Sequence, residues 1–434
     1  MARAIARNSG EHQVHFLLNG LFQDQIDDVI SSFGDVAKPE QFHVFSMPGP
    51  TDALRLENGW RRAAAHTLYE AVVHDLAPDA LLIGSLFEGG NDDTVVGVGV
   101  EGRRYVTAVI LYDLIPLLDP ATYISSSGAR AWYHGKIEEL CQADLLLGIS
   151  HSACREAIDH LSVEKDRVHH IGAAADDNFN ADLHSSSWNS SMAEEILAYH
   201  GISRPFVMHA SAFDARKNFD GLIAAFGSLS PVIRDQHQLV LVCKLSAATR
   251  QTLLKAAAEA GLTEDDVILT GFVPDDELRV LYANCKLFAF PSFHEGFGLP
   301  VVEAMWCGAP VIGSSLSSVP EVVGREDAQF DPRNPAALSS VLSRALTDED
   351  WRQELVSHAA IHARRFCWDD VARRAIDVID ARLDGRSQTV RAENVVDRVA
   401  GLSVWPGPTD SDLLATARSL AANEHLSWPL DKVQ

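Results

Sequence analysis

The stretch SFHEGFGLPVVEAMWCGAPVIGSS, residues 292–315, decides the fold of this chain. It continues the apolar run LFAFPS, residues 287–292, which is typical of a strand that is buried on both faces. Pro300 then stands where a helix accepts a proline, in its first turn. A buried strand, a short loop and a helix in this order predict a ligand site, because parallel α/β sheets bind ligands at the carboxyl ends of their strands.

The loop carries two carboxylates and a run of backbone donors. N–H groups at the start of a helix attract an anion, and glycine lets a ligand approach the backbone closely. Glu295 can accept hydrogen bonds from sugar hydroxyls, and Glu303 can hold a diol. A plain tight turn, with Glu303 as a favourable charge in the first turn of the helix, is the alternative. The predicted backbone donors belong to Gly296, Gly298 and Leu299.

Apolar runs alternate with amphipathic stretches on both sides of this loop, which predicts parallel α/β structure. Strands are expected at residues 14–20, 42–47, 80–86, 106–114, 144–150, 206–211, 239–245, 267–273, 287–292 and 310–315. Helices are expected at residues 57–75, 128–141, 192–200, 217–229, 247–260, 275–284, 300–307 and 368–384. A polar, turn-rich region begins near residue 176 and separates two groups of strands, so we expect two Rossmann-like domains.

The loop HASAFDARKN follows the first strand of the second group. Its adjacent cations Arg216 and Lys217 can neutralise a diphosphate that accumulates charge as it leaves. A solvated pair of cations at a helix start is the alternative. The formal net charge of the chain is −24, and in so acidic a chain the position of these two cations after a strand favours the binding interpretation.

Two other strand ends carry candidate residues. In LTGFVPDDEL, the backbone of Gly271, Phe272 and Val273 can line a pocket for a base, and a plain turn with a buried Phe272 is an equal alternative. In LYDLIPLLDP, Asp113 is either a helix cap or a cleft residue, and Tyr112 is either a core residue or a ligand-facing one. The chemistry of these residue types does not choose between those roles.

The composition limits the classes of function. The formal net charge is −24 over 434 residues, and so acidic a surface repels the phosphate backbones of nucleic acids. No apolar stretch is long enough to span a bilayer, and the N-terminal MARAIARNSGEHQ does not have the pattern of a signal peptide. The six cysteines are scattered and no His, Asp or Glu spacing indicates a metal site, so we expect a cytoplasmic protein without a bound metal.

The longer string SFHEGFGLPVVEAMWCGAPVIGSSLSSVPEVVG resembles the signature of family 4 glycosyltransferases. FDARKN resembles the diphosphate-binding loop of that family, TGFVPDDEL its loop near the nucleotide base, and FCWDDVARRAIDVI its C-terminal crossover helix. YDLIPLLDP resembles a motif of mannosyltransferases that build bacterial surface polysaccharides. The resemblance covers about residues 1–385 and implies the GT-B fold, in which two Rossmann-like domains face each other across a cleft.

The resemblance also implies roles for the matching residues. Glu295 would contact the donor sugar, and Glu303 would hold the ribose of the nucleotide. Arg216 and Lys217 would bind the diphosphate and stabilise its departing charge. Backbone groups of Phe297, Gly298 and Leu299 would assist. The implied reaction retains the anomeric configuration, needs no metal, and uses no cofactor beyond the nucleotide-sugar donor.

Two features depart from the family pattern. Tyr112 stands where many members have a histidine, next to Asp113, and we interpret it as a subfamily trait on the acceptor side. Family members begin with a strand and a glycine-rich loop, whereas this chain starts inside what should be the first helix. We therefore expect a first domain that lacks its N-terminal strand and glycine-rich loop.

The predicted organisation has five parts. These are an N-terminal acceptor-side domain at 1–178, a linker with a short helix at 179–203, a nucleotide-sugar-binding domain at 204–367, a crossover helix at 368–385, and a tail or linker at 386–434. The tail resembles the linker of larger multidomain relatives, so other glycosyltransferase domains are candidate partners.

The predicted function is a retaining, metal-independent glycosyltransferase that moves a hexose to a polysaccharide or a lipid-linked glycan. Mannose from GDP-mannose is the favoured donor, and UDP-hexose and dTDP-rhamnose are the alternatives. A catalytically impaired GT-B module that binds glycan, nucleotide or a partner is the alternative class, because of the missing loop. We expect the protein in the cytoplasm, with peripheral attachment to the inner membrane face left open.

Overall fold

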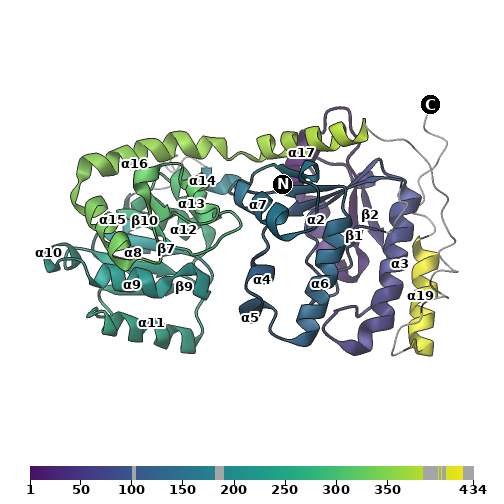
Figure 1. The fold of residues 1–434 in the computed structure, drawn as a ribbon, viewed down its shortest axis with the longest axis horizontal. Helices are drawn as coiled ribbons and strands as arrows, with labels where there is room; N and C mark the ends of the chain where they lie inside the picture. Colours follow the sequence, from purple (N-terminus) through teal and green to yellow (C-terminus); the bar gives the residue numbers. More distant parts are fainter. Residues whose placement is uncertain (100–103, 181–189, 385–398, 400–401, 403–406, 424–434) are drawn as a thin grey trace. The chain divides into compact units, whose positions relative to one another are not determined.

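The computed structural model describes the chain except for residues 100–103, 181–189, 385–398, 400–401, 403–406 and 424–434 (Figure 1). The chain separates into two compact units. Unit 1 contains Met1–Ile149, Cys154–Ile171 and Asp369–Gln434, and unit 2 contains Ser150–Ala153 and Gly172–Trp368. Of the helices in the described residues, none combines the length and the apolar character needed to cross a membrane.

Unit 2 is built on a parallel six-stranded sheet with the strand order β12-β11-β10-β7-β8-β9. Every residue of β7, β8, β10 and β11 is buried, as expected for strands covered by helices on both faces. The sequence did not predict β12, because two residues form no recognisable apolar run. The strands are β7 (Phe206–Ala210), β8 (Gln238–Val242), β9 (Val267–Gly271), β10 (Leu287–Phe290), β11 (Val311–Ser314) and β12 (Gln329–Phe330).

The helices of unit 2 flank this sheet (Figure 1). They are α8 (Ser190–Tyr199), α9 (Phe219–Gly227), α10 (Pro231–Arg234), α11 (Ala247–Glu259), α12 (Asp275–Asn284), α13 (Leu299–Trp306), α14 (Val319–Val323), α15 (Pro335–Thr347) and α16 (Glu349–His362). α9 contacts α11 and α15, while α12 contacts α8 and α13. The prediction placed the start of α9 two residues too early, because the 3₁₀ turn η6 (Ala215–Lys217) and Asn218 precede it.

The described strands of unit 1 form two parallel sheets. β1 (Phe16–Asn19) pairs with β2 (Phe42–Phe45), and the second sheet has the order β3-β4-β5-β6. Its strands are β3 (Ala80–Ile83), β4 (Val106–Leu111), β5 (Leu145–Gly148) and β6 (Val168–His170). The sequence did not predict β6, whose three residues include two histidines. The helices are α1 (Ala2–Arg7), α2 (Gln23–Ser32), α3 (Gly59–Leu76), α4 (Ile115–Leu118), α5 (Pro120–Tyr123), α6 (Ser127–Gln142), α7 (His151–His160), α17 (Trp368–Leu383) and α19 (Asp410–Asn423). The first three residues of α7 and the first residue of α17 belong to unit 2.

The two sheets of unit 1 share an apolar core. Val95 belongs to the buried cluster around β2 and α3, and Val98 belongs to the cluster around β4 and β5. Leu81 of β3 packs against both clusters. Side-chain burial therefore joins the sheets, although the described strands of one form no ladder with those of the other.

The C-terminal part of the chain packs on unit 1. α19 contacts α3, where Nη1 of Arg61 bonds Oδ1 of Asp412 at 2.9 Å. The side chain of Asn423 accepts from the backbone N–H of Ser46 at 2.7 Å and donates to its carbonyl at 2.8 Å. These contacts make α19 part of the folded unit.

α17 also bonds to unit 1 from Asp369 onward. Oδ1 of Asp369 accepts hydrogen bonds from Arg7 and Asn8, both at 2.6 Å. Arg374 donates to the carbonyl of Ile171 at 2.6 Å. Of the predicted connection between the domains, residues 181–189 lie outside the described residues.

Candidate functional site

The loops after β7 and β10 meet at the carboxyl edge of the unit 2 sheet. β7 and β10 are neighbours, yet the chain continues from β7 to β8 on one side and from β10 to β11 on the other. The strand order thus reverses between them, and α/β sheets bind ligands at such a reversal. Arg216 and Lys217 follow β7 and Glu295 follows β10, so this topology brings the predicted cations to the predicted carboxylate.

Glu295 lies between the two cations. Nζ of Lys217 donates to Oε1 at 2.6 Å, and Nη1 of Arg216 donates to Oε2 at 2.6 Å. Charge-assisted bonds of this kind are stronger than neutral ones. Lys217 is 7% exposed and Glu295 6%, so the solvated-pair alternative is wrong for Lys217. Burial lowers the pKa of the Lys217 ammonium from its usual value, and the Glu295 carboxylate opposes that shift.

The backbone around the cations is fixed by local hydrogen bonds. The Asp214 side chain accepts from the N–H of Arg216 at 2.9 Å, which closes the turn η6. Asn218 follows in the left-handed region with φ 58° and caps α9. Its amide nitrogen donates to the carbonyls of Pro291 at 3.2 Å and Pro332 at 3.1 Å. The loop after β7 is thereby tied to the loop after β10.

The loop that carries Glu295 is held by two serines. Oγ of Ser317 accepts from the N–H of Glu295 at 2.9 Å. Oγ of Ser318 lies 2.9 Å from the carbonyl oxygen of Glu295 and 2.7 Å from that of Phe297. Gly298 ends the loop at the N-terminus of α13. Its φ of 116° is a backbone conformation that residues other than glycine rarely adopt.

The four predicted donor residues of this loop lie in two environments. Gly296, Phe297 and Gly298 are buried, while Leu299, the first residue of α13, is 39% exposed. The Phe297 ring packs edge-on against Phe366 at 5.6 Å between centroids. The backbone of the loop therefore stands at a helix N-terminus, where N–H groups favour an anion.

Glu303 lies one turn inside α13. The helix begins at Leu299 and its first turn holds no acidic residue, so the first-turn-charge alternative is wrong. Oε2 of Glu303 accepts a hydrogen bond from the Tyr282 hydroxyl at 3.0 Å. Burial raises the pKa of Glu303 to about 7, against the lowering effect of that hydrogen bond.

The predicted base-side residues end β9, at the far edge of the sheet. β8 separates β9 from β7, which places these strands on the order of 10 Å apart. Gly271 has φ 78° and Val273 is 5% exposed. The Phe272 side chain is 74% exposed, so the alternative of a buried Phe272 is wrong.

The two predicted acceptor-side residues belong to unit 1. Tyr112 is 49% exposed, and its hydroxyl donates to the carbonyl of Gly84 at 2.9 Å. Oδ1 of Asp113 accepts from the N–H of Ile115, the first residue of α4, at 3.0 Å. Asp113 therefore holds the turn that precedes α4, although the N-cap residue of that helix is Leu114.

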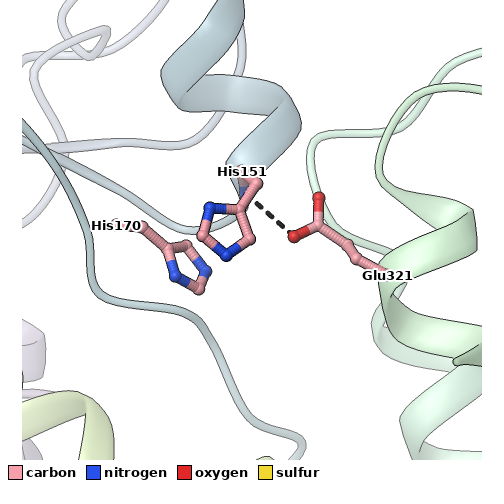
Figure 2. A group of neighbouring side chains, drawn as sticks. All are labelled: His151, His170 and Glu321. Atoms are coloured by element: carbon pink, nitrogen blue, oxygen red, sulfur yellow. Dashed lines mark hydrogen bonds between the residues drawn. The ribbon is translucent and has the colours of Figure 1, made fainter.

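Glu321 of α14 is a further carboxylate that the sequence did not single out. It accepts a hydrogen bond from the backbone N–H of His151 at 2.9 Å (Figure 2). It accepts another from the backbone N–H of Ser152 at 3.1 Å, and both residues belong to unit 2. These residues open α7, and a carboxylate at a helix N-terminus is favourable. Figure 2 also draws His170, which belongs to unit 1.

Sequence reasoning missed the residues that support the site. His209 is fully buried, donates from Nδ1 to the carbonyl of Ala289 at 3.0 Å, and bonds Ser211 through Nε2 at 2.9 Å. Burial lowers its pKa to about 4, so the ring is neutral. A histidine inside the apolar run FVMHAS was a signal for such a buried bond, whereas the spacing of Tyr282 fits a core residue equally well.

Known proteins resemble the chain in sequence. Residues 194–362 match the family model described as "Glycosyl transferases group 1". The chain is 34% identical over 427 residues to the "Serotype-specific mannosyltransferase WbdA" of Escherichia coli, a match that covers 98% of this chain and 52% of that protein. The chain thus spans about half the length of the curated relatives that it matches over nearly all its residues.

Several solved structures have a fold similar to that of this chain. Anabaena Alr3699/HepE, solved in complex with UDP and glucose, matches with a TM-score of 0.63 and 18% identity, covering 87% of this chain and 94% of that one. WaaG, described as a glycosyltransferase involved in lipopolysaccharide biosynthesis, matches with a TM-score of 0.56 and 16% identity, covering 85% and 98%. Residues 194–362 are therefore a glycosyltransferase group 1 domain, carried by a chain with the GT-B fold of two Rossmann-like units.

Proposed function

We propose that this chain is a retaining glycosyltransferase that moves a hexose, mannose from GDP-mannose, to a polysaccharide or lipid-linked glycan. The observation that carries the proposal is the Glu295 carboxylate bonded by Arg216 and Lys217 at the strand reversal of the group 1 domain. The WbdA relative is named a mannosyltransferase, which supports mannose as the sugar. Because that relative is about twice as long as this chain, its activity is transferred here only as a proposal.

The cations suit a leaving diphosphate. An ammonium offers three donors, so the bond to Oε1 of Glu295 uses only part of the capacity of Lys217. The carboxylates of Glu295 and Asp214, the latter with Oδ1 3.8 Å from Nε of Arg216, balance the two cations, so an anion would be bound by N–H donors and not by a net charge. The N-terminus of α13 adds backbone donors on the same side of the sheet.

Each predicted residue takes a role in this proposal. Glu295 contacts the donor sugar, and Glu303 holds the ribose diol. The backbone of the loop at 296–299 assists with the diphosphate, and the backbone at 271–273 lies beside the base. Tyr112 and Asp113 are assigned to the acceptor side.

The proposed transfer conserves the configuration of the anomeric carbon. The acceptor hydroxyl attacks on the face from which the diphosphate departs, and the bond between the sugar and the diphosphate oxygen breaks. Arg216 and Lys217 stabilise the charge on that oxygen, and the departing diphosphate takes the proton of the acceptor hydroxyl. A lipid-linked acceptor would place this reaction in the cytoplasm, at the inner membrane face.

A melting-temperature panel tests the donor class. A ligand that binds only the folded state raises the melting temperature by mass action, so GDP, UDP, dTDP and ADP are compared at equal concentration. We expect the largest rise with GDP; a larger rise with UDP or dTDP assigns the alternative donors.

Product analysis then tests the reaction. Purified protein, GDP-mannose and a mannose-terminated oligosaccharide should give a new α-linked mannose, detected by its anomeric NMR signal. If the protein binds the nucleotide but shows neither transfer nor hydrolysis of the donor, the transferase proposal is overturned in favour of the impaired binding module.

A further inference from the structure

A fully buried tyrosine holds the carboxylate that we assign to the ribose. Tyr282 on α12 donates its hydroxyl proton to Oε2 of Glu303 on α13, at 3.0 Å. α12 and α13 are in direct contact, and Tyr282 has no exposed surface. Water therefore cannot take the place of this donor.

The tyrosine ring has a fixed orientation. Phe179 packs edge-on against it with 6.1 Å between ring centroids, and Phe288 of β10 packs edge-on at 5.3 Å. Contacts from two elements prevent the ring from turning its hydroxyl away from Glu303. The hydrogen bond thus sets where the carboxylate points, and does not merely follow it.

The surroundings of Glu303 otherwise oppose its negative charge. Burial and the neighbouring carboxylates of Asp275 and Asp176 all raise its pKa. Cys307, one turn further along α13, has its pKa raised to about 12 by burial, so it is a neutral thiol. The Tyr282 hydroxyl acts in the opposite direction, because a donor bonded to a carboxylate favours the ionised form.

We propose that Tyr282 is a positioning residue for nucleotide recognition: its hydroxyl directs the Glu303 carboxylate at the ribose diol and favours the ionised form of that carboxylate. The inference rests on the proposed function, because that function assigns Glu303 to the ribose. A pKa of about 7 places the titration of Glu303 within the range where the protein can be assayed. An ionised carboxylate accepts stronger hydrogen bonds from hydroxyls than a neutral carboxyl does.

The test removes only the hydroxyl group, in Tyr282→Phe. The probes are the nucleoside diphosphate that gives the largest rise in melting temperature and its 2′,3′-dideoxy counterpart. Their Kd values are measured from about pH 6 to pH 8.5, around the pKa of Glu303. The ratio of the two Kd values reports diol recognition, since titration of the phosphates affects both ligands equally.

In the wild-type protein we expect the preference for the diol to rise with pH around neutrality. In Tyr282→Phe the midpoint should move to higher pH, and the preference at pH 7 should fall about tenfold, the worth of a hydrogen bond to a charged group. Glu303→Gln should abolish the pH dependence of the ratio.

Tyr69→Phe is the matched control. It also removes a buried hydroxyl, one that donates to the carbonyl of Gly97 in unit 1 at 3.3 Å. Its ratio should equal that of the wild type. A Tyr282→Phe ratio with wild-type size and midpoint, or an equal loss of affinity for both ligands, would overturn the positioning role alone. Failure of the wild-type protein to bind any of the nucleotides would instead overturn the proposed function and this inference together.

Discussion

The two units apply the same alternation of strand and helix in different ways. In unit 2 one sheet of six strands reverses its order between β7 and β10, and the loops after those strands share an ion cluster. In unit 1 the described strands form two sheets, and Tyr112 and Asp113 bond to backbone groups of unit 1 itself. Loops after neighbouring strands thus meet in both units, but they join charged side chains in unit 2, whereas in unit 1 the Tyr112 hydroxyl after β4 bonds the backbone carbonyl of Gly84 after β3.

Removing Glu295 is expected to have the largest effect, because it removes the carboxylate from the ion cluster of unit 2. Glu295→Ala should lower the transfer rate about a hundred- to a thousandfold, because the sugar contact is lost and the cations lose the group that positions them. The measurement is steady-state transfer from GDP-mannose. Glu354→Ala, which removes an exposed acid bonded to Arg325 in the same unit, should retain the wild-type rate. Wild-type activity in Glu295→Ala would remove the site from unit 2.

Removing Lys217 separates recognition of the diphosphate charge from recognition of the base. Lys217→Ala should weaken binding of the nucleoside diphosphate about thirtyfold and binding of the nucleoside less than about twofold, because the ammonium faces only phosphate in the proposal. Isothermal titration calorimetry with both ligands measures the difference. Lys255→Ala serves as the control, since that lysine is exposed and pairs with Glu259 on α11. Equal losses for both ligands would contradict the phosphate role.

Asn218 tests whether the junction between the two loops stabilises unit 2. Asn218→Ala removes a helix cap and two bonds to backbone carbonyls at a positive φ, and should cost about 3 kcal/mol. Asn218→Gly loses the same bonds but accepts the backbone conformation, so it should cost about 1 kcal/mol less. Hydrogen exchange of the β7 amides measures both, with the β4 amides of unit 1 as the internal reference. Identical effects of the two variants would show that φ is unimportant there.

Asp412 gives the smallest expected effect and concerns unit 1. Burial alone would raise its pKa, but hydrogen bonds from Thr409 and Arg61 outweigh burial and hold the pKa below its usual value. A group with a depressed folded pKa stabilises the fold above its unfolded pKa, and this contribution is lost as the pH falls. Asp412→Asn should therefore loosen α19 by about 1 kcal/mol at pH 7 and by less at pH 3.

Hydrogen exchange of the α19 amides measures this loosening. Asp410→Asn changes an exposed acid on the same helix and is the control. A loss of protection that is as large at pH 3 as at pH 7 would show that the charge of Asp412 does not hold the helix.

Most of the fold could be predicted because parallel strands are apolar runs. The two strands that were missed, β6 and β12, contain three residues and two residues, too few for such a pattern. The α9 boundary was misplaced because a left-handed Asn218, which sequence pattern does not reveal, starts the helix after the cations. For the same reason the sequence placed Lys217 at the start of a helix and could not predict its burial.

The predicted residues of the candidate site lie in sequence motifs that follow strands. The residues that hold them in place do not lie in such motifs. Glu295 could be paired in advance with the cations only through the resemblance, since 78 positions separate it from Lys217. Tyr282 has the spacing of an ordinary core residue of α12, so its bond to Glu303 depends on how two helices pack. Sequence periodicity gives the face of a helix, but the atom met by a side chain on that face is set by tertiary packing.

The serines that hold the Glu295 loop have a consequence for binding entropy. Ser317 and Ser318 bond the backbone of Glu295 and Phe297 and so fix this loop. Ordering a residue from a mobile loop costs about 1–2 kcal/mol of conformational free energy, and a loop that is already ordered does not incur this cost when a ligand arrives. Donor binding should therefore carry little entropic cost from ordering this segment. A mutation at Ser318 should weaken donor binding mainly by making the entropy of binding less favourable.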